Sequence, residues 1–211
     1  NSSASHNLRD SSRDANGLKH LQSDLADAED TESDAGVTAF LDDGFRLKGT
    51  NAGSGQVNAN GGTFVAWNWK ANGGTTTTND ASATSIGSRD SVFQANTTAG
   101  FSIVTYTGDG GTGVDTYRHG LQVNGVATTP EVIICKNRDA SDAWLFGATA
   151  IPNFNWVNDY MHLQDTIAHQ TNAGGTAFKV APTSTVFSVG EFLNKANNYV
   201  AYCFASAEGY S

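Results

Sequence analysis

The chain of 211 residues contains 23 glycines and only 16% charged residues, which suits a turn-rich all-β protein and disfavours a helical bundle. Its formal net charge of −9 disfavours binding to nucleic acids, because phosphates attract basic surfaces. No window has the length and apolarity of a membrane span, so membrane insertion is not expected, and no signal peptide is recognised.

The first half of the chain contains one ambiguous segment and one strong strand pattern. Residues 18–29, "LKHLQSDLADAE", fit a short helix or a strand and loop, and both remain open. The stretch "FVAWNWKA" at 64–71 predicts a strand, because alternate residues of a strand point to opposite faces. Val65, Trp67 and Trp69 would face a core, and the opposite face would be mixed, as in a half-covered sheet.

The second half contains several short apolar runs that predict strands, at 101–107, 132–136, 144–148, 185–190 and 199–206. The last run, "YVAYCFAS", resembles "FVAWNWKA", and we expect the two to occupy equivalent positions in two similar sheets. Truncation of Trp67 or Tyr202 to alanine should then cost about 3–5 kcal/mol. Short strands between frequent turns predict an all-β fold, an antiparallel β-sandwich of jelly-roll or concanavalin-like type.

An internal repeat relates the two halves. "HLQ" occurs at 20–22 and at 162–164, and Phe45 and Phe187 have the same separation of 142 residues. The two similar strands are 135 residues apart, and the seven-residue difference lies in the Gly/Asn-rich stretch 49–62. A constant separation with one change in a loop is typical of a tandem duplication.

The repeat divides the chain into three parts. Residues 1–71 would be the back half of a first β module, 72–98 a polar connector, and 99–211 a complete second β-sandwich module. A half-module exposes an apolar face and unpaired strand edges. We therefore expect residues 1–71 to make their main apolar contacts outside themselves, with a neighbouring chain slightly favoured over the second module.

Motifs for cofactors and metals are weak. "GDGGTG" at 108–113 matches G-x-G-x-x-G, but no helical pattern follows it, which favours a hairpin loop and predicts no nucleotide cofactor. A run of acidic residues could hold calcium or form a solvated loop, and the loop is favoured because the EF-hand spacing is missing. The run comprises Asp24, Asp27, Glu29, Asp30, Glu32 and Asp34.

The titratable residues do not form a recognisable catalytic or zinc pattern. None of the five histidines is spaced as a zinc ligand, and His119 is expected to be a structural hydrogen-bonding residue at a turn. Cys135 and Cys203 lie in apolar runs and could be two buried thiols or one disulfide. We expect no catalytic residues, no metal and no enzymatic activity.

One aromatic segment, residues 143–160, could bind a sugar. Trp144, Trp156 and Tyr160 lie there among Asn and Asp residues, a mixture that suits stacking on sugar rings with amide hydrogen bonds alongside. The same residues also suit the edge of an ordinary core, which is the favoured alternative.

The pattern "GFSIVTYTGDG…HGL…PEVIICKNRD…W…APTSTVFSVG…NNYVAYCFASAEGYS" resembles an uncharacterised β-rich domain found in tandem in tail-fibre and other virion proteins of marine bacteriophages, cyanophages among them. The first copy, "GLKHLQSDLADAED…DGFRL…NANGGTFVAWNWKANGG", resembles the back half of the same domain. Two departures are the long link "HGLQVNGVATTPE" and the shortened first copy.

The resemblance implies a lectin-like sandwich in a virion structural protein, part of a tail fibre or similar appendage that attaches to the host surface or acts as a spacer. It implies a virion or extracellular location, self-association as a trimer or filament, and a host-surface glycan as a possible ligand. The alternative is an extracellular adhesin, carbohydrate-binding module or filament subunit that no phage carries. A polysaccharide depolymerase ranks third.

Overall fold

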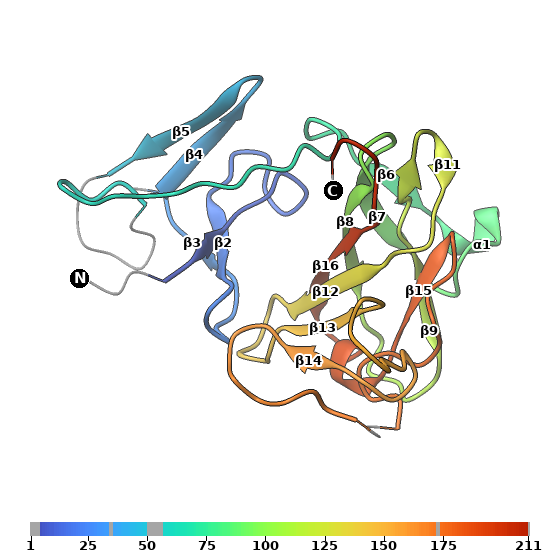
Figure 1. The fold of residues 1–211 in the computed structure, drawn as a ribbon. Helices are drawn as coiled ribbons and strands as arrows, with labels where there is room; N and C mark the ends of the chain where they lie inside the picture. The colour runs from blue at the N-terminus through green and yellow to red at the C-terminus, as the bar shows by residue number, and fades with distance from the viewer. Residues whose placement is uncertain (1–4, 34–35, 50–56, 172–173, 211) are drawn as a thin grey trace.

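The computed structural model describes residues 5–33, 36–49, 57–171 and 174–210. Its centre is an antiparallel seven-stranded sheet with the order β14-β13-β12-β16-β8-β7-β6 (Figure 1). The strands are β6 (Thr77–Asn79), β7 (Ser91–Asn96), β8 (Phe101–Thr107), β12 (Val132–Asn137), β13 (Leu145–Ala148), β14 (Met161–His162) and β16 (Asn198–Phe204). The predicted all-β antiparallel sandwich is therefore confirmed.

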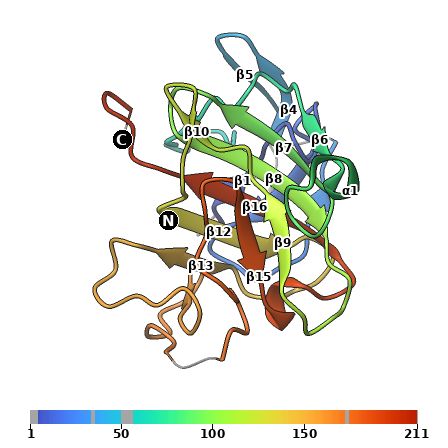
Figure 2. The same cartoon turned by 90° about the vertical axis from the view of Figure 1, so that its right-hand side faces the viewer.

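A second layer covers one face of this sheet (Figure 2). It contains the strand pair β9 (Asp115–Arg118) and β15 (Val186–Val189), followed by the 3₁₀ turn η1 (Glu191–Leu193). Tyr106 from the sheet packs between Tyr117 of β9 and Tyr199 of β16, with ring centroids 4.1 and 5.0 Å apart. The large apolar side chains of both layers therefore form one core.

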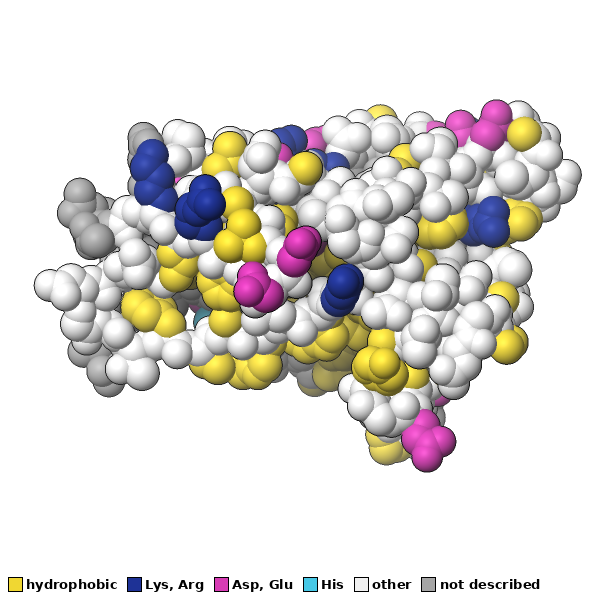
Figure 3. Space-filling view, turned by 90° about the horizontal axis from the view of Figure 1, so that it is seen from above, with side chains coloured by type: hydrophobic (Ala, Val, Ile, Leu, Met, Phe, Trp, Pro, Cys, Tyr) yellow, Lys and Arg dark blue, Asp and Glu magenta, His cyan; other side chains and the backbone are white. Residues whose placement is uncertain are grey.

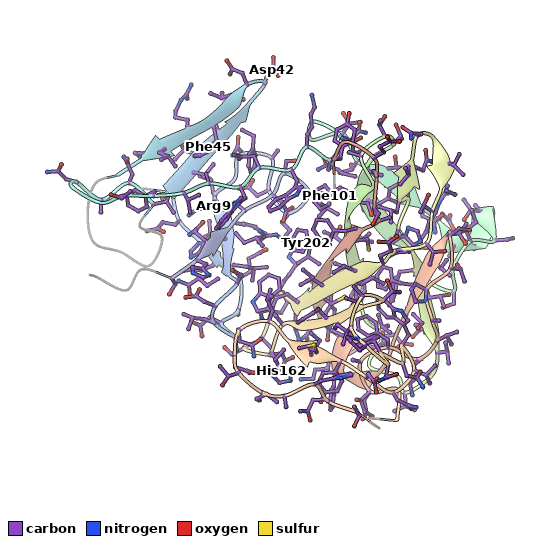
Figure 4. All side chains as sticks on the ribbon, viewed as in Figure 1. Arg9, Asp42, Phe45, Phe101, His162 and Tyr202 are labelled. Carbon is purple, nitrogen blue, oxygen red and sulfur yellow. The ribbon has the colours of Figure 1, made fainter. Side chains whose placement is uncertain are left out.

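The N-terminal residues form a third layer on the opposite face. Strands β1 (Asn7–Leu8), β2 (Lys19–Gln22) and β3 (Asp30–Thr31) pair antiparallel, so residues 18–29 contain a strand and a loop and no helix. Leu21 enters a second apolar cluster, whose other buried members come from the sandwich: Phe101, Ile103, Trp144, Val200 and Tyr202. Figure 4 shows Phe101 and Tyr202 between the two layers.

The segments after this layer leave the body of the molecule. Strands β4 (Gly36–Leu41) and β5 (Gly44–Lys48) form a hairpin that projects outward (Figure 1). Residues 57–76 then run below this hairpin in the view of Figure 1 and reach the sandwich at β6. Residues 72–98, expected as a connector, contribute β6, β7 and the short helix α1 (Ala81–Thr84) to the sandwich. The sheet therefore continues through the predicted boundary at residue 98.

The strand predicted at 64–71 is wrong. Residues 61–70 belong to no strand and are exposed, with 71% of Trp67 accessible to solvent. The physical reason is the lack of neighbours: β16 pairs with β12 and with β8, whereas no described strand lies against 64–70. The similar run at 199–206 carries the same expectation of a mixed, half-covered face. That expectation is also wrong, because Tyr199, Ala201 and Cys203 of β16 are fully buried under the β9–β15 layer.

Residues 5–33 contact the sandwich closely. The indole Nε1 of Trp144 donates to the carbonyl oxygens of Gln22 and Leu25, at 2.9 and 3.1 Å. The expectation that this part of the chain packs outside itself therefore holds for residues 5–33, and the sandwich of the same chain supplies the contacts. Cys135 and Cys203 are both buried and unbridged, so the structure has two free thiols.

Candidate functional site

Four exposed large apolar residues lie on one extended segment, residues 64–70, which we call the aromatic strip. Phe64 is 48% exposed, Val65 69%, Trp67 71% and Trp69 61%. Seen from above, apolar side chains cluster on this face over the β4–β5 hairpin and residues 57–76 (Figure 3). Single exposed apolar residues are ordinary, but a contiguous group of this size marks a contact surface.

The strip is anchored at its C-terminal end. Asn96 Nδ2 donates to the carbonyl of Lys70 at 2.9 Å, and Ala71 packs against the second apolar cluster. The ring of Trp69 meets the ring of Phe204 edge-on at 6.3 Å, and Phe204 in turn packs on Phe101 at 4.9 Å. The exposed aromatic surface is therefore continuous with the interface between the N-terminal layer and the sheet.

The β4–β5 hairpin adds apolar area beside the strip. Phe40 is 37% exposed and Leu41 47%, next to the turn that carries Asp42 and Asp43 (Figure 4). Within 36–70 the charged residues are three cations and two carboxylates: Arg46, Lys48, Lys70, Asp42 and Asp43. This part of an acidic protein is thus close to neutral, which favours contact with another macromolecule over repulsion.

A buried network of ion pairs and hydrogen bonds, which we call the polar seam, attaches the N-terminal layer to the sandwich. Tyr202 Oη donates to Asp10 Oδ2 at 2.6 Å, and Arg13 pairs with both Asp10 and Glu29. Glu29 also receives two hydrogen bonds from Arg138, at 2.8 and 3.0 Å. These contacts join the N-terminal layer to β16 and to the loop after β12.

The seam perturbs both carboxylates. Burial would raise the pKa of Asp10, but the Arg13 guanidinium and the Tyr202 hydroxyl outweigh it and hold that pKa below its ordinary value. Burial likewise opposes ionisation of Glu29, but the hydrogen bonds from Arg138 and Arg13 lower its pKa. Both groups are thus ionised and paired near neutral pH, which gives the seam a structural role.

The aromatic residues predicted to bind a sugar are not together at the surface. Trp144 is fully buried, and Trp156 is 8% exposed and packs edge-on against Phe154 and Phe178. Tyr160 is partly buried and stacks on His162 at 5.7 Å. The two tryptophans therefore cannot stack on a sugar from solvent, because the N-terminal layer covers the first and the loop around Phe178 covers the second.

The glycine-rich loop 108–113 joins β8 to β9, and no helix follows it. Asn194 Nδ2 donates to Asp109 and Asp115, while Arg89 pairs with both carboxylates. A Cβ at Gly108 would collide with the carbonyl oxygen of Lys195. The loop is therefore packed as a structural corner, with its acidic groups neutralised from within.

His119 has the structural role predicted for it. Its Nδ1 accepts from Leu121 N–H at 3.0 Å, so its Nε2 must be the protonated nitrogen that donates to Thr183 O at 3.1 Å. Burial lowers the pKa of His119 to about 4. In the acidic run, Glu29 is bound in the seam, Asp24 accepts from the backbone N–H of His6, and Asp34 lies outside the described residues.

Two further surveys cover the described part of the chain. No group of three or more His, Cys, Asp or Glu side chains there is arranged to hold a metal ion. No helix in it is long and apolar enough to cross a membrane. A groove of about 420 Å³ lies on the sheet, with a lining that is partly polar and partly apolar: Thr78, Arg89, Asp90, Ser91, Val92, Thr105, Tyr106, Thr107, Arg138 and Asn198.

Fold and surface together define an all-β sandwich protein with an exposed aromatic strip and a groove on the sheet. The chain belongs to the family described as domain of unknown function DUF7483, whose family model matches residues 1–211. No curated protein and no solved structure matches the chain.

The strand pattern at 64–71 predicted that the strip faces a core. The exposed surface that the strip forms was therefore not predicted. The signal that could have exposed it was present: the first repeat has no counterpart of the strands at 101–107 and 132–136. A strand without neighbours must either find them in another polypeptide or face water.

Proposed function

We propose that the chain is a structural module of a bacteriophage virion, part of a tail fibre or similar extracellular appendage, with no catalytic role. The observation that supports this best is the aromatic strip: three aromatic rings and a valine stand exposed on one segment above a rigid sandwich. Such a surface suits permanent contact with another part of an assembly.

Several features support an assembly role over a solitary one. The strip is anchored at its C-terminal end by Lys70 and Ala71, which reduces the entropy lost at that end when a partner binds. The surrounding hairpin is nearly neutral in a chain of net charge −9, which lowers the repulsion between copies at this face. We expect self-association through the strip, with host attachment or spacing as its purpose.

The test is the mass of the protein in solution, measured by light scattering, together with a glycan array. We expect an oligomer whose stability falls when the strip is truncated by Trp67→Ala and Trp69→Ala together. Val126→Ala is a matched control, because Val126 is 67% exposed on β11 (Val126–Ala127), away from the strip. A monomer at every concentration would contradict the proposal.

A second candidate is an extracellular adhesin or carbohydrate-binding module. The groove on the sheet favours it, since threonine hydroxyls, the Asn198 amide and Arg138 could bind sugar hydroxyls or a sugar carboxylate. The substitution Thr78→Arg would fill this groove from the exposed edge strand β6. If a glycan binds and Thr78→Arg abolishes that binding while Trp67→Ala leaves it intact, the groove is the glycan-binding site.

A further inference from the structure

The internal repeat can be compared position by position in the structure. "TAF" occurs at 38–40 in the β4–β5 hairpin and at 176–178 in the second repeat, and the Phe45/Leu47 pair corresponds to Phe187/Val189. The aromatic strip corresponds to β16. Phe40, Phe45, Leu47 and the strip therefore have counterparts in the sandwich, at separations of 138, 142, 142 and 135 residues.

The counterparts differ sharply in burial. Phe178 is 2% exposed where Phe40 is 37%, and Val200 is fully buried where Val65 is 69% exposed. Tyr202 is 6% exposed where Trp67 is 71%. At these three positions the first repeat exposes to solvent a side chain whose counterpart lies in the core of the second, whereas Leu21 of the first repeat is buried and its counterpart Leu163 is exposed.

The missing element is strand pairing. In β16, seven residues pair with β8 and six with β12. Among the described residues, no backbone–backbone hydrogen bond joins 63–70 to another segment. Both edges of an extended, apolar segment are therefore free, which is the condition for strand addition from another chain.

We propose that the aromatic strips of two copies of this chain pair as antiparallel strands about a two-fold axis through Trp67. In this register Trp67 faces Trp67 of the second copy, and Val65 faces Trp69, so that one side of the ribbon carries only large apolar pairs. This inference rests on the proposal that the strip is an assembly surface and names its partner.

The exposed apolar area of the strip and hairpin is large enough for an interface with a second copy of the chain. A fully buried aromatic side chain removes about 150–250 Å² from solvent. On that scale the exposed parts of the strip, Phe40 and Leu41 offer on the order of 600 Å² of apolar surface, close to the roughly 800 Å² per partner of a standard interface.

Charge supports the same choice and the same face. Two chains of net charge −9 repel one another over most of their surfaces. The stretch 36–70 departs from this excess of negative charge, with three cations against two carboxylates. Charge repulsion therefore does not oppose contact between two copies at the aromatic strip.

Cysteine cross-linking of the whole chain tests the register. Trp67→Cys places two thiols opposite each other across the axis, where directly opposed residues have Cβ atoms about 4.5–5.5 Å apart. We expect a covalent dimer on mild oxidation, formed at least tenfold faster than with Val65→Cys or with Val126→Cys on β11. The native thiols do not interfere, because Cys135 and Cys203 are buried. Equal cross-linking of the three variants would overturn the proposal.

Light scattering on the double variant Val65→Pro/Ala66→Pro tests strand pairing itself. The two prolines remove one backbone N–H from each edge of the strip. They alter no residue of the sandwich strands. We expect the dimer to dissociate, and the variant to melt at the same temperature as the parent protein diluted until it is monomeric. If Trp67→Ala with Trp69→Ala dissociates the copies and the prolines do not, the strip assembles through side chains alone, so strand pairing fails and the proposed function stands.

A peptide with the sequence of residues 98–109, which contain β8, tests whether the strip pairs with a foreign strand and not with a second copy. If the chain is monomeric and this peptide, unlike a scrambled one, shifts tryptophan emission to shorter wavelength, the strip accepts a foreign strand. Pairing of two copies would then be wrong.

Discussion

The aromatic strip and β16 have similar apolar patterns and opposite environments. "VAYCF" forms the centre of a seven-stranded sheet, with Val200 and Cys203 fully buried. "VAWNW" lies unpaired at the surface, with Val65 and Trp67 about seven-tenths exposed. The difference teaches that alternating apolar residues specify a strand only when neighbouring strands are present to pair with it.

The most direct way to sharpen this comparison is to truncate the buried member. Tyr202→Ala should lower the free energy of unfolding by about 3–5 kcal/mol, because it removes a buried ring from the cluster with Leu21 and Trp144 and a hydrogen-bond donor from Asp10. Urea denaturation followed by circular dichroism measures this loss. A loss below about 1 kcal/mol would mean that the N-terminal layer does not pack on β16.

Next in size is the seam that attaches the N-terminal layer. Arg13→Met should cost about 3 kcal/mol, since it leaves Asp10 without its cation in a buried site. Limited proteolysis should then cleave within residues 5–33 faster than in the parent protein. Lys70→Met, which removes a cation beside the exposed strip, is the control and should change neither measurement.

A pH titration separates the sandwich from the strip. Burial lowers the pKa of His119 to about 4, so the unfolded chain takes up its proton first as the pH falls below about 6.5. Stability from His119 is complete above pH 6.5 and should decline by roughly 2–3 kcal/mol as the pH falls to about 4.

Asp10 and Glu29 have lowered pKa values, so their contribution is kept until the pH falls below about 4.5 and is lost only in stronger acid. Denaturation curves at pH 7.5 and pH 5 therefore report mainly on histidines. His119→Gln should flatten the change between them. An unchanged slope in that variant would assign the effect to another group, such as buried His20, whose pKa burial also lowers.

The smallest effect is expected at the exposed member of the pair. Trp67→Ala should change the free energy of unfolding of the monomer by less than about 0.5 kcal/mol, because most of the side chain already faces water. The value of about 3–5 kcal/mol predicted from the strand pattern is thus corrected for Trp67 and kept for Tyr202. A large loss of unfolding free energy in a dilute, monomeric sample would mean that Trp67 is part of a core. The contrast with β16 would then be wrong.

Much of the sandwich could be predicted from the sequence. β8, β12 and β16 coincide closely with the runs at 101–107, 132–136 and 199–206, since these dense β-branched and aromatic runs pair with one another. The structural role of His119 and the two buried thiols also follow from local sequence. β6 and β7 were not predicted, because "TTTTND" and "DSVFQAN" are polar stretches of the kind that predicts a loop.

By itself the sequence determined the fold class and the strongest strands, because these depend on composition and on patterns along the chain. The tertiary structure decided which of two similar stretches is buried, and it placed Trp144 and Trp156 in cores and the aromatic strip in solvent. The physical reason is that burial and strand pairing depend on segments far away in sequence. Residues 5–33 cover β16 from more than 160 positions away, and no described strand lies beside residues 64–70.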